Sequence, residues 1–352
     1  MSRIVHVVGT GTIGEPLIGL LADNREAFGI DEVTFHKRTP LVEERPKVND
    51  LIRRGAFLAV NEDRAASFEA LGHAPKYDAT DAIERATVVI DCTPAGLANK
   101  EDHYEKARGP IGFLAQGSEF GFGKMYARGI NDDALDRSTD RFLQIVSCNT
   151  HNISALVKTL GMDEDGTSHL ENGRFVCLRR ANDISQDDDF LPAPVVGKHG
   201  DDRFGTHHAR DAHHLFMTLG FDLPLFSSAV KIPTQYMHSL WFSLLLDRDI
   251  TRDEVIELLD ANTRIALTAR TSANSVFSFG RDHGYFGRIL NQAVVPVSSV
   301  TVRDGREVVG FCFTPQDGNS ILSSVAATLW YLHRGDFEDR IDVIRPYLFR
   351  EV

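Results

Sequence analysis

The chain has 352 residues, which is enough for two domains of ordinary size. Its hydrophobic fraction of 42% and charged fraction of 25% are typical of a soluble globular protein, and no stretch approaches the roughly 18 apolar residues of a membrane span. The net charge of −12 argues against nucleic acid as a partner, because neutralising phosphates requires a basic surface.

The N-terminus and the cysteines indicate a cytoplasmic protein. The sequence enters an apolar strand within its first residues, without the charged and apolar regions of a signal peptide. The four cysteines lie far apart with no paired spacing, at Cys92, Cys148, Cys177 and Cys312. This pattern disfavours a disulfide framework or a zinc knuckle and fits a reducing compartment.

A glycine-rich turn near the N-terminus predicts a dinucleotide site. An apolar strand at 3–8 runs into Gly-Thr-Gly-Thr-Ile-Gly at 9–14, and an amphipathic helix follows at about 16–23. In this order Gly9 allows the tight turn, Gly11 lets a pyrophosphate approach the backbone, and the third glycine lets the helix pack on the strand.

The end of the second expected strand, at 32–36, indicates which cofactor is bound. The acidic residue that usually holds the adenosine ribose 2′-hydroxyl is missing, and Lys37, Arg38 and Thr39 stand there instead. Cations at this place favour a 2′-phosphate, so we expect NADP or NAD, with NADP favoured. The alternative is a solvated basic turn.

The rest of the first half alternates between helices and buried strands. The strand at 87–90 ends in Asp-Cys-Thr-Pro, where the amides near Thr93 would lie beside a cofactor. The alternation predicts a Rossmann-like, doubly wound parallel sheet with helices on both faces. The other expected segments are helix and connection at 51–59 and 64–71, helices at 79–86 (capped by Thr80 or Asp81) and 100–107, and a strand at 111–114.

A cysteine is expected at the end of a buried strand in the stretch 144–152. Its sequence, Gln-Ile-Val-Ser-Cys-Asn-Thr-His-Asn, begins with apolar residues and ends with polar ones. Residues 153–160 have helical spacing, so Cys148 is expected at a helix start, where backbone N–H groups favour the thiolate. Ligands bind at this end of the strands in open α/β sheets. The alternative is a buried structural cysteine.

After Cys148 the pattern becomes strand-rich, which predicts an α+β domain built on a mixed or antiparallel sheet. The clearest signals are a helix at 252–261 with a Thr251/Glu254 capping box and a hairpin around Asp304-Gly305. The other expected elements are strands at 174–178, 229–232, 298–303 and 308–313, an apolar run at 239–245, an exposed acidic turn at 187–189, and closing helices at 319–332 and 338–348.

Three groups of polar residues in this half could carry chemistry. Arg179-Arg180 supply two guanidiniums suited to an oxyanion, or they form surface ion pairs with Asp183, Asp187 or Asp188. The histidines between His207 and His214 lack a usual zinc spacing, so no metal is expected. His238 could be a general base for the thiol, or a structural histidine.

Seven stretches together resemble the archaeal-type (type II) glyceraldehyde-3-phosphate dehydrogenases. They follow the family's order and span nearly the whole chain; VSCNT followed by IPTQYMH is the most specific pair. The stretches are GTGTIG at 9–14, DCTPAGLANK at 91–100, FLAQGSE at 113–119, VSCNT at 146–150, LRR at 178–180, HHARD at 207–211 and IPTQYMH at 232–238.

The resemblance implies roles for individual residues. Cys148 resembles the family's nucleophile and His238 its general base. Substrate contacts are implied for Asn149, Thr150, Arg179, His207 and His208. Cofactor contacts are implied for Gly9, Gly11, Thr12, Ile13, Lys37, Arg38, Thr93, Gly117, Arg180 and Gln316, with Lys37 near the adenosine 2′-phosphate.

The resemblance also implies an activity and an organisation. The activity is oxidation of a phosphorylated aldehyde with inorganic phosphate and NAD(P)⁺ to an acyl phosphate, through a thioester on Cys148. The enzyme would be a homotetramer without nucleic-acid or membrane partners. The dinucleotide-binding domain would comprise 1–147 and 317–352, and the catalytic domain 148–316.

Departures from the family pattern lie in the substrate half. His151-Asn152 replace Thr-Gly, Arg-Arg is followed by Ala181-Asn182, and an acidic turn occupies 187–189. A sister dehydrogenase or acyl-phosphate reductase acting on another aldehyde is therefore an alternative. A silent dinucleotide-binding regulator and a histidine-based metal module are the others.

Overall fold

The computed structural model describes residues 1–352 except 1, 118, 164, 184–189, 235 and 316. The chain forms two compact units, each built from separated segments. The first comprises Met1–Lys124, Leu135–Ile145 and Ser323–Arg345. The second comprises Met125–Ala134, Val146–Leu322 and Pro346–Val352. In the described part of the chain, no helix is long and apolar enough to cross a membrane.

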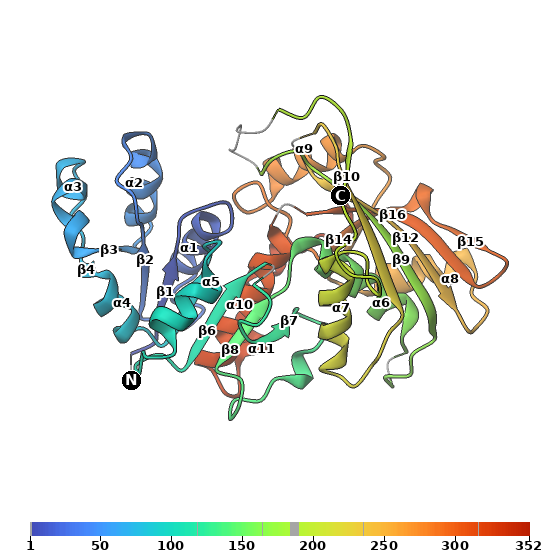
Figure 1. Cartoon of the computed structure of the whole chain (residues 1–352), viewed down its shortest axis with the longest axis horizontal. Coiled ribbons are helices and arrows are strands. Elements are labelled where there is room, and N and C mark those ends of the chain that lie inside the picture. Colours follow the sequence, from blue (N-terminus) through green and yellow to red (C-terminus); the bar gives the residue numbers. More distant parts are fainter. Residues whose placement is uncertain (1, 118, 164, 184–189, 235, 316) are drawn as a thin grey trace. The chain divides into compact units, whose positions relative to one another are not determined.

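The first unit is built on an eight-stranded sheet in the order β4-β3-β2-β1-β5-β6-β8-β7. The pairings from β4 to β8 are all parallel, and helices lie on both sides of the sheet (Figure 1), so the predicted α/β class is confirmed. The strands are β1 (Ile4–Val8), β2 (Glu32–His36), β3 (Phe57–Val60), β4 (Tyr77–Asp78), β5 (Val88–Asp91), β6 (Gly112–Gln116), β7 (Lys124–Tyr126) and β8 (Phe142–Ile145).

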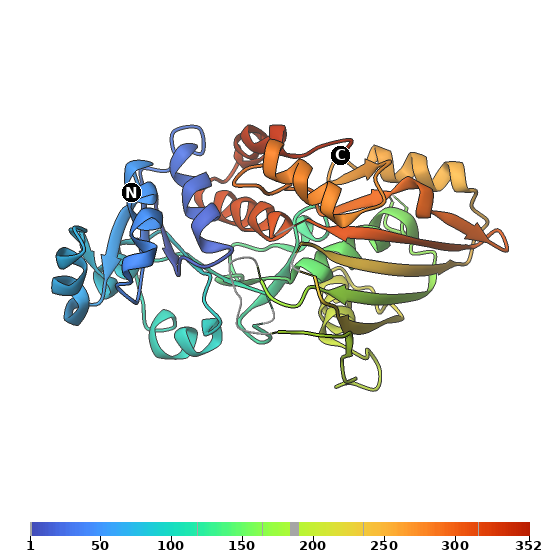
Figure 2. The ribbon, with the colours of Figure 1, turned by 90° about the horizontal axis from the view of Figure 1, so that it is seen from above.

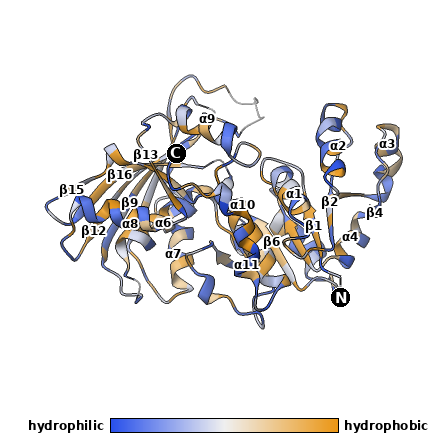
Figure 3. Ribbon diagram, turned by 180° about the vertical axis from the view of Figure 1, so that it is seen from behind, coloured by the Kyte–Doolittle hydropathy of each residue, from blue (hydrophilic) through white to orange (hydrophobic). Residues whose placement is uncertain are grey.

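The central strands of this sheet are buried on both faces. All residues of β1 and β6 are buried, and Figure 3 shows these strands in hydrophobic colours. Such continuous apolar runs are typical of parallel sheets covered by helices. The helices are α1 (Gly14–Asp23), α2 (Arg45–Arg53), α3 (Ala65–Ala70), α4 (Ala79–Arg85), α5 (Gly96–Asn99), the π-helical Lys100–Tyr104, α10 (Gly318–Leu332), which continues from the second unit, and α11 (Phe337–Ile341).

The helix predicted at 51–59 is wrong. The chain forms α2 six residues earlier, with a proline in its first turn, and residues from Phe57 form β3. Proline is favoured at a helix start, and Gly55, with φ of +98°, allows the turn that ends it. Asp78 rather than Thr80 or Asp81 caps α4, because its side chain accepts a hydrogen bond from the Thr80 amide.

The second unit is built on a mixed sheet in the order β10-β11-β9-β12-β16-β14-β13, with β15 paired to β16. Figure 2 shows β9, β12 and β16 side by side, and both of their pairings are antiparallel. The strands are β9 (Leu170–Arg179), β10 (Val195–Val196), β11 (Leu225–Lys231), β12 (His238–Leu246), β13 (Ile265–Thr268), β14 (Ala293–Pro296), β15 (Thr301–Arg303) and β16 (Glu307–Thr314).

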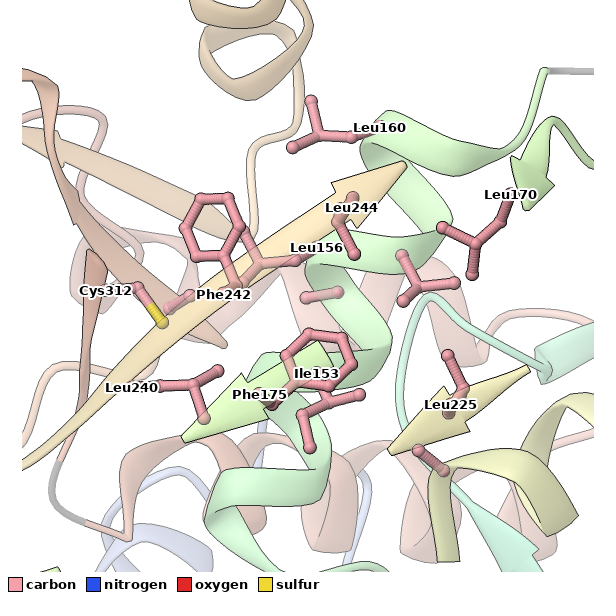
Figure 4. Packing of buried hydrophobic residues seen from close by; sticks show 14 of the residues in the cluster. Ile153, Leu156, Leu160, Leu170, Phe175, Leu225, Leu240, Phe242, Leu244 and Cys312 are labelled. Atoms are coloured by element: carbon pink, nitrogen blue, oxygen red, sulfur yellow. The ribbon is translucent and has the colours of Figure 1, made fainter. Parts of the chain in front are cut away.

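Helix α6 (Cys148–Gly161) is the centre of the second core. Ile153, Leu156 and Leu160 pack with Phe242 and Leu244 of β12 in one buried cluster (Figure 4). Burying such side chains stabilises the fold by about 1.5–3 kcal/mol each. The start of α6, with Cys148, is thereby held on a rigid base. The unit's other helices are α7 (His207–Met217), α8 (Arg252–Ala261) and α9 (Ala273–His283).

Two local signals in this unit are confirmed. Thr251 and Glu254 form the reciprocal capping box of α8. Asp304 and Gly305, with φ of +49° and +72°, connect β15 to β16. The strand expected at 298–303 is shorter, because Val297–Ser299 form a 3₁₀ turn. The helix expected at 338–348 is α11 followed by a 3₁₀ segment, Asp342–Tyr347, that contains Pro346.

Candidate active site

Cys148 is the first residue of α6, so the predicted helix start at the thiol is confirmed. Ser147 caps the helix: its side chain accepts a hydrogen bond from the Thr150 amide. Asn319 donates from Nδ2 to the Cys148 carbonyl oxygen at 3.0 Å. The backbone around the sulfur is therefore fixed from both sides, and the thiol itself is half-buried.

The expectation that the helix start favours a thiolate is corrected by burial. Desolvation, and then the nearby Asp317, raise the pKa of Cys148 to about 11, although Arg180 and Arg179 act in the opposite direction. Burial therefore destabilises the thiolate by more than the backbone N–H groups at the start of α6 stabilise it. The resting group is a neutral thiol, so it needs a base to become a nucleophile.

His238, the first residue of β12, lies beside this thiol. Its Nδ1 is 3.7 Å from Cys148 Sγ. Burial, and then Arg180 and Arg179, lower the pKa of His238 to about 3, so the imidazole is neutral near pH 7 and can accept a proton. The two side chains that the sequence singled out 90 residues apart form one pair.

A buried chain of polar side chains extends from this pair. Asn149 Oδ1 lies 3.3 Å from His238 Nδ1, and Asn149 Nδ2 donates to His208 Nε2 at 3.2 Å. His208 Nδ1 in turn lies 3.0 Å from Thr206 Oγ1, which contacts Ser227 Oγ at 2.6 Å. Asn149 is 1% exposed, so its side chain faces other residues of the protein rather than an open surface.

Arg179 and Arg180 lie in different environments. The Arg180 side chain is buried and pairs with Asp183 at 2.8 Å and, more loosely, with Asp317 at 3.8 Å. One of the ion pairs proposed from the sequence therefore exists. Arg179 is exposed and lines a separate pocket.

That pocket, of about 330 Å³, has the chemistry of an anion site. Arg179, Lys198 and Arg210 line it together with Thr206 and His207 at the start of α7, and one acid, Asp201, is also present. Thr206 makes no side-chain cap to α7, but the Ala209 amide in its first turn already donates to Ser227 Oγ at 3.1 Å, so the donors of the pocket are mainly side chains. A phosphate group fits these donors.

The remaining residues around the thiol are inaccessible. Thr150, His151 and Asn152 are each fully buried. His151 donates from Nδ1 to the Ser147 carbonyl oxygen at 3.0 Å, and Asn152 donates to the Gln292 carbonyl oxygen at 2.5 Å. The departure from the family pattern at 151–152 thus alters the packing of α6 rather than a ligand-contacting surface.

The glycine-rich turn of the first unit fits a dinucleotide. An added Cβ at Gly14 would lie 2.1 Å from the Gly9 carbonyl oxygen, so the helix could not pack there with any other residue. At Gly11 no protein atom lies within 4 Å of an added Cβ, which leaves the backbone open to a ligand. Thr12 and Ile13 are half-buried in the same turn.

A pocket of about 710 Å³ opens at the ends of the central strands. Gly9, His36, Arg38 and Thr93 are among its lining residues, and its size suits a cofactor. Thr93 is held in place because its amide and its hydroxyl both donate to Asp91 Oδ1, at 2.8 and 2.6 Å.

Lys37 and Arg38 point to opposite sides. Lys37 is buried and pairs with Glu44, whereas Arg38 lines the pocket. Within the part of the chain that the structure describes, no carboxylate pairs with Arg38. His36, the last residue of β2, lines the same pocket as Arg38.

Of two further predicted cofactor residues, the structure describes one, Gly117. Gly117, with φ of +76°, follows β6 and donates from its amide to the Ile145 carbonyl oxygen at 2.9 Å. Gln316 lies outside the described residues, as does the acidic turn at 187–189. Among the described residues, no three histidine, cysteine or acidic side chains come together as a metal site. The rings of His207 and His208 contact each other at a tilt, with centroids 3.9 Å apart.

Comparison with known proteins gives a consistent set of relatives. No family model matches the chain. It is 29% identical over 321 residues to a glyceraldehyde-3-phosphate dehydrogenase of Methanopyrus kandleri, covering 86% of this chain and 84% of the relative. It is 26% identical to that of Methanocaldococcus jannaschii (86% of each) and 25% identical to that of Pyrobaculum islandicum (85% and 83%).

Proposed function

We propose that this chain, which belongs to the archaeal-type glyceraldehyde-3-phosphate dehydrogenase family, oxidises a phosphorylated aldehyde and conserves the energy as an acyl phosphate. The observation that supports this most strongly is the contact between Cys148 Sγ and His238 Nδ1 at the start of α6. A thiol beside a neutral imidazole is the arrangement needed for covalent catalysis on a carbonyl group.

Cys148 attacks the aldehyde carbon and forms a hemithioacetal. His238, which is neutral because burial lowers its pKa, accepts the proton that the reaction releases. A bound nicotinamide supplies the acceptor for the hydride. The thioester left on Cys148 is then cleaved by inorganic phosphate, which releases the acyl phosphate and restores the thiol.

The anion pocket on α7 supports a phosphorylated substrate. Arg179, Lys198 and Arg210 supply its cations, and the buried hydrogen bond between Asn149 and His208 connects it with the catalytic pair. We do not assign Arg180 as a ligand of the substrate phosphate, because Asp183 and Asp317 already pair with it. It acts on the thiol electrostatically.

The cofactor is a nicotinamide dinucleotide held by the first unit, and we assign NADP as the preferred form. Arg38, rather than Lys37, supplies the cation for a 2′-phosphate, because Arg38 faces the cofactor pocket and Lys37 is committed to Glu44. Gly9, Gly11 and Thr93 would border the same ligand.

The test is a spectrophotometric assay with glyceraldehyde 3-phosphate, phosphate or arsenate, and each nicotinamide in turn. We expect reduction of NADP that depends on phosphate, and a loss of turnover in Cys148→Ser of at least a hundredfold. Cofactor binding, followed by fluorescence titration, should persist in that variant. Turnover without Cys148 would contradict the proposal.

A related dehydrogenase acting on a different phosphorylated aldehyde is the second candidate. It is favoured by Arg180, whose guanidinium faces Asp183 and Asp317 instead of an open pocket. A panel of aldehydes with and without a phosphate group separates the two. A sister substrate would show a kcat/KM above that of glyceraldehyde 3-phosphate.

A further inference from the structure

The buried side chain of Asn149 lies between two histidines, and its orientation is fixed by one of them. Burial, and then His207 and Arg179, keep the pKa of His208 well below its usual value, so this ring is neutral. Its Nε2 therefore accepts from Asn149 Nδ2, and its Nδ1–H donates to Thr206 Oγ1. The amide of Asn149 cannot rotate without losing this bond.

The fixed orientation directs Asn149 Oδ1 at His238 Nδ1, 3.3 Å away. Thr314 also donates to this oxygen, at 3.2 Å, but it has a single proton and also approaches Asn152 Oδ1 more closely. The nitrogen that faces Asn149 is the same one that faces Cys148 Sγ. With the proton of the resting neutral ring on Nε2, Nδ1 can take the thiol proton, and the carbonyl oxygen of Asn149 then accepts a hydrogen bond from the new N–H.

We propose that Asn149 is a positioning residue that stabilises the proton which His238 Nδ1 takes from Cys148, and not a substrate ligand. As the S–H bond breaks, the proton moves to Nδ1 and the new N–H donates to Asn149 Oδ1. The charged groups that act on the pair are Arg179, Arg180, Asp183 and Asp317, and His207 and His208 lie further along the chain of contacts. Because the buried imidazolium is shielded from water, Asn149 supplies the acceptor for its new N–H.

This role rests on the proposed function, and it is tested without any aldehyde. The second-order rate of Cys148 alkylation by iodoacetamide is measured from pH 6 to 10, with the modified peptide quantified by mass spectrometry. Below the thiol's midpoint this rate follows the thiolate fraction. Asn149→Leu removes the acceptor at similar volume, and we expect its rate–pH profile to lie roughly tenfold below the wild type.

Two matched variants separate the acceptor from general packing. Asn149→Asp keeps an oxygen toward Nδ1, so its rate should equal or exceed that of the wild type. Thr314→Val removes another hydrogen bond to the same oxygen and should stay within about twofold. The role is overturned if Asn149→Leu matches the wild type, if Asn149→Asp is as slow as Asn149→Leu, or if Thr314→Val is slowed equally. A wild type that alkylates as expected but oxidises no aldehyde would contradict only the proposed function.

Discussion

Several histidines of this protein are buried in the neutral form, and this sets its response to acid. Desolvation lowers the pKa of His6 to about 3 and that of His151 to about 4. The unfolded chain binds these protons near pH 6.5, before the folded state does. The stability they contribute is present above pH 6.5 and is lost progressively as the pH falls toward 3 to 4.

His6 allows this to be measured. It is fully buried in β1 and contacts Thr34 Oγ1 at 2.7 Å. In the wild type we expect the free energy of unfolding of the first unit to fall by about 1.4 kcal/mol per pH unit for this group between pH 6 and 4. His6→Leu should show a shallower slope in urea denaturation, whatever its stability at pH 7. Equal slopes would contradict the assignment.

We expect Arg38 to set the cofactor preference at the level of a single side chain. Because its guanidinium is the cation facing the pocket, Arg38→Ala should raise the KM for NADP about tenfold or more and leave that for NAD nearly unchanged. Lys37→Met is the matched control: it breaks the buried pair with Glu44 and should cost stability without changing the NADP to NAD ratio. The reverse pattern would assign the 2′-phosphate to Lys37.

Individual helices owe part of their stability to their first residue, and α8 and α9 differ in this respect. Thr251 accepts a hydrogen bond from the Glu254 amide, whereas Ser272 at the start of α9 makes no such bond. Thr251→Ala should therefore lower the free energy of unfolding by about 1 kcal/mol, and Ser272→Ala by less than about 0.5 kcal/mol. Similar losses in denaturant titrations of both variants would show that the cap of α8 contributes nothing of its own.

Local patterns predicted elements well where the signal was complete within a few residues. The capping box of α8 and the Asp304-Gly305 turn were of this kind. The boundary between α2 and β3 was missed because the predicted helix ran through Gly55, where the chain turns with φ of +98° before β3. For the site, the sequence identified Cys148 and His238, but not which neighbours would reach them.

The neighbours of the pair depend on contacts that sequence spacing does not encode. Asn149 and His208 are 59 residues apart, and Thr314 meets Asn149 across 165. The rise in the pKa of Cys148 was missed for the same reason, because desolvation is a property of the folded surroundings. The different environments of Lys37 and Arg38 were missed because both residues follow the end of β2, where strand alternation no longer applies.

At the scale of the whole molecule, one face of the second sheet is the surface where we expect subunits to meet. Trp241 of β12 lies directly opposite Val176 of β9 and Phe311 of β16, and Phe311 is 40% exposed. Large apolar side chains grouped on a sheet face are typical of an interface between subunits. We therefore expect the protein to form a homo-oligomer, such as a tetramer.

A charge in this face tests the assembly. Trp241→Glu should lower the mass measured by sedimentation velocity to that of a smaller species, because a carboxylate would be buried without a partner. Val42→Glu, at a 67% exposed site in the first unit, is the control and should sediment as the wild type does. A monomeric wild type, or an unchanged Trp241→Glu, would contradict the expectation.

The central claim is that Cys148, paired with His238, carries the substrate as a thioester. The most direct measurement is mass spectrometry of the enzyme mixed with glyceraldehyde 3-phosphate and NADP in the absence of phosphate. The account predicts an acyl adduct on the peptide containing Cys148, absent in Cys148→Ser and discharged when phosphate is added. Reduction of NADP without an adduct, or an adduct at another residue, would contradict it.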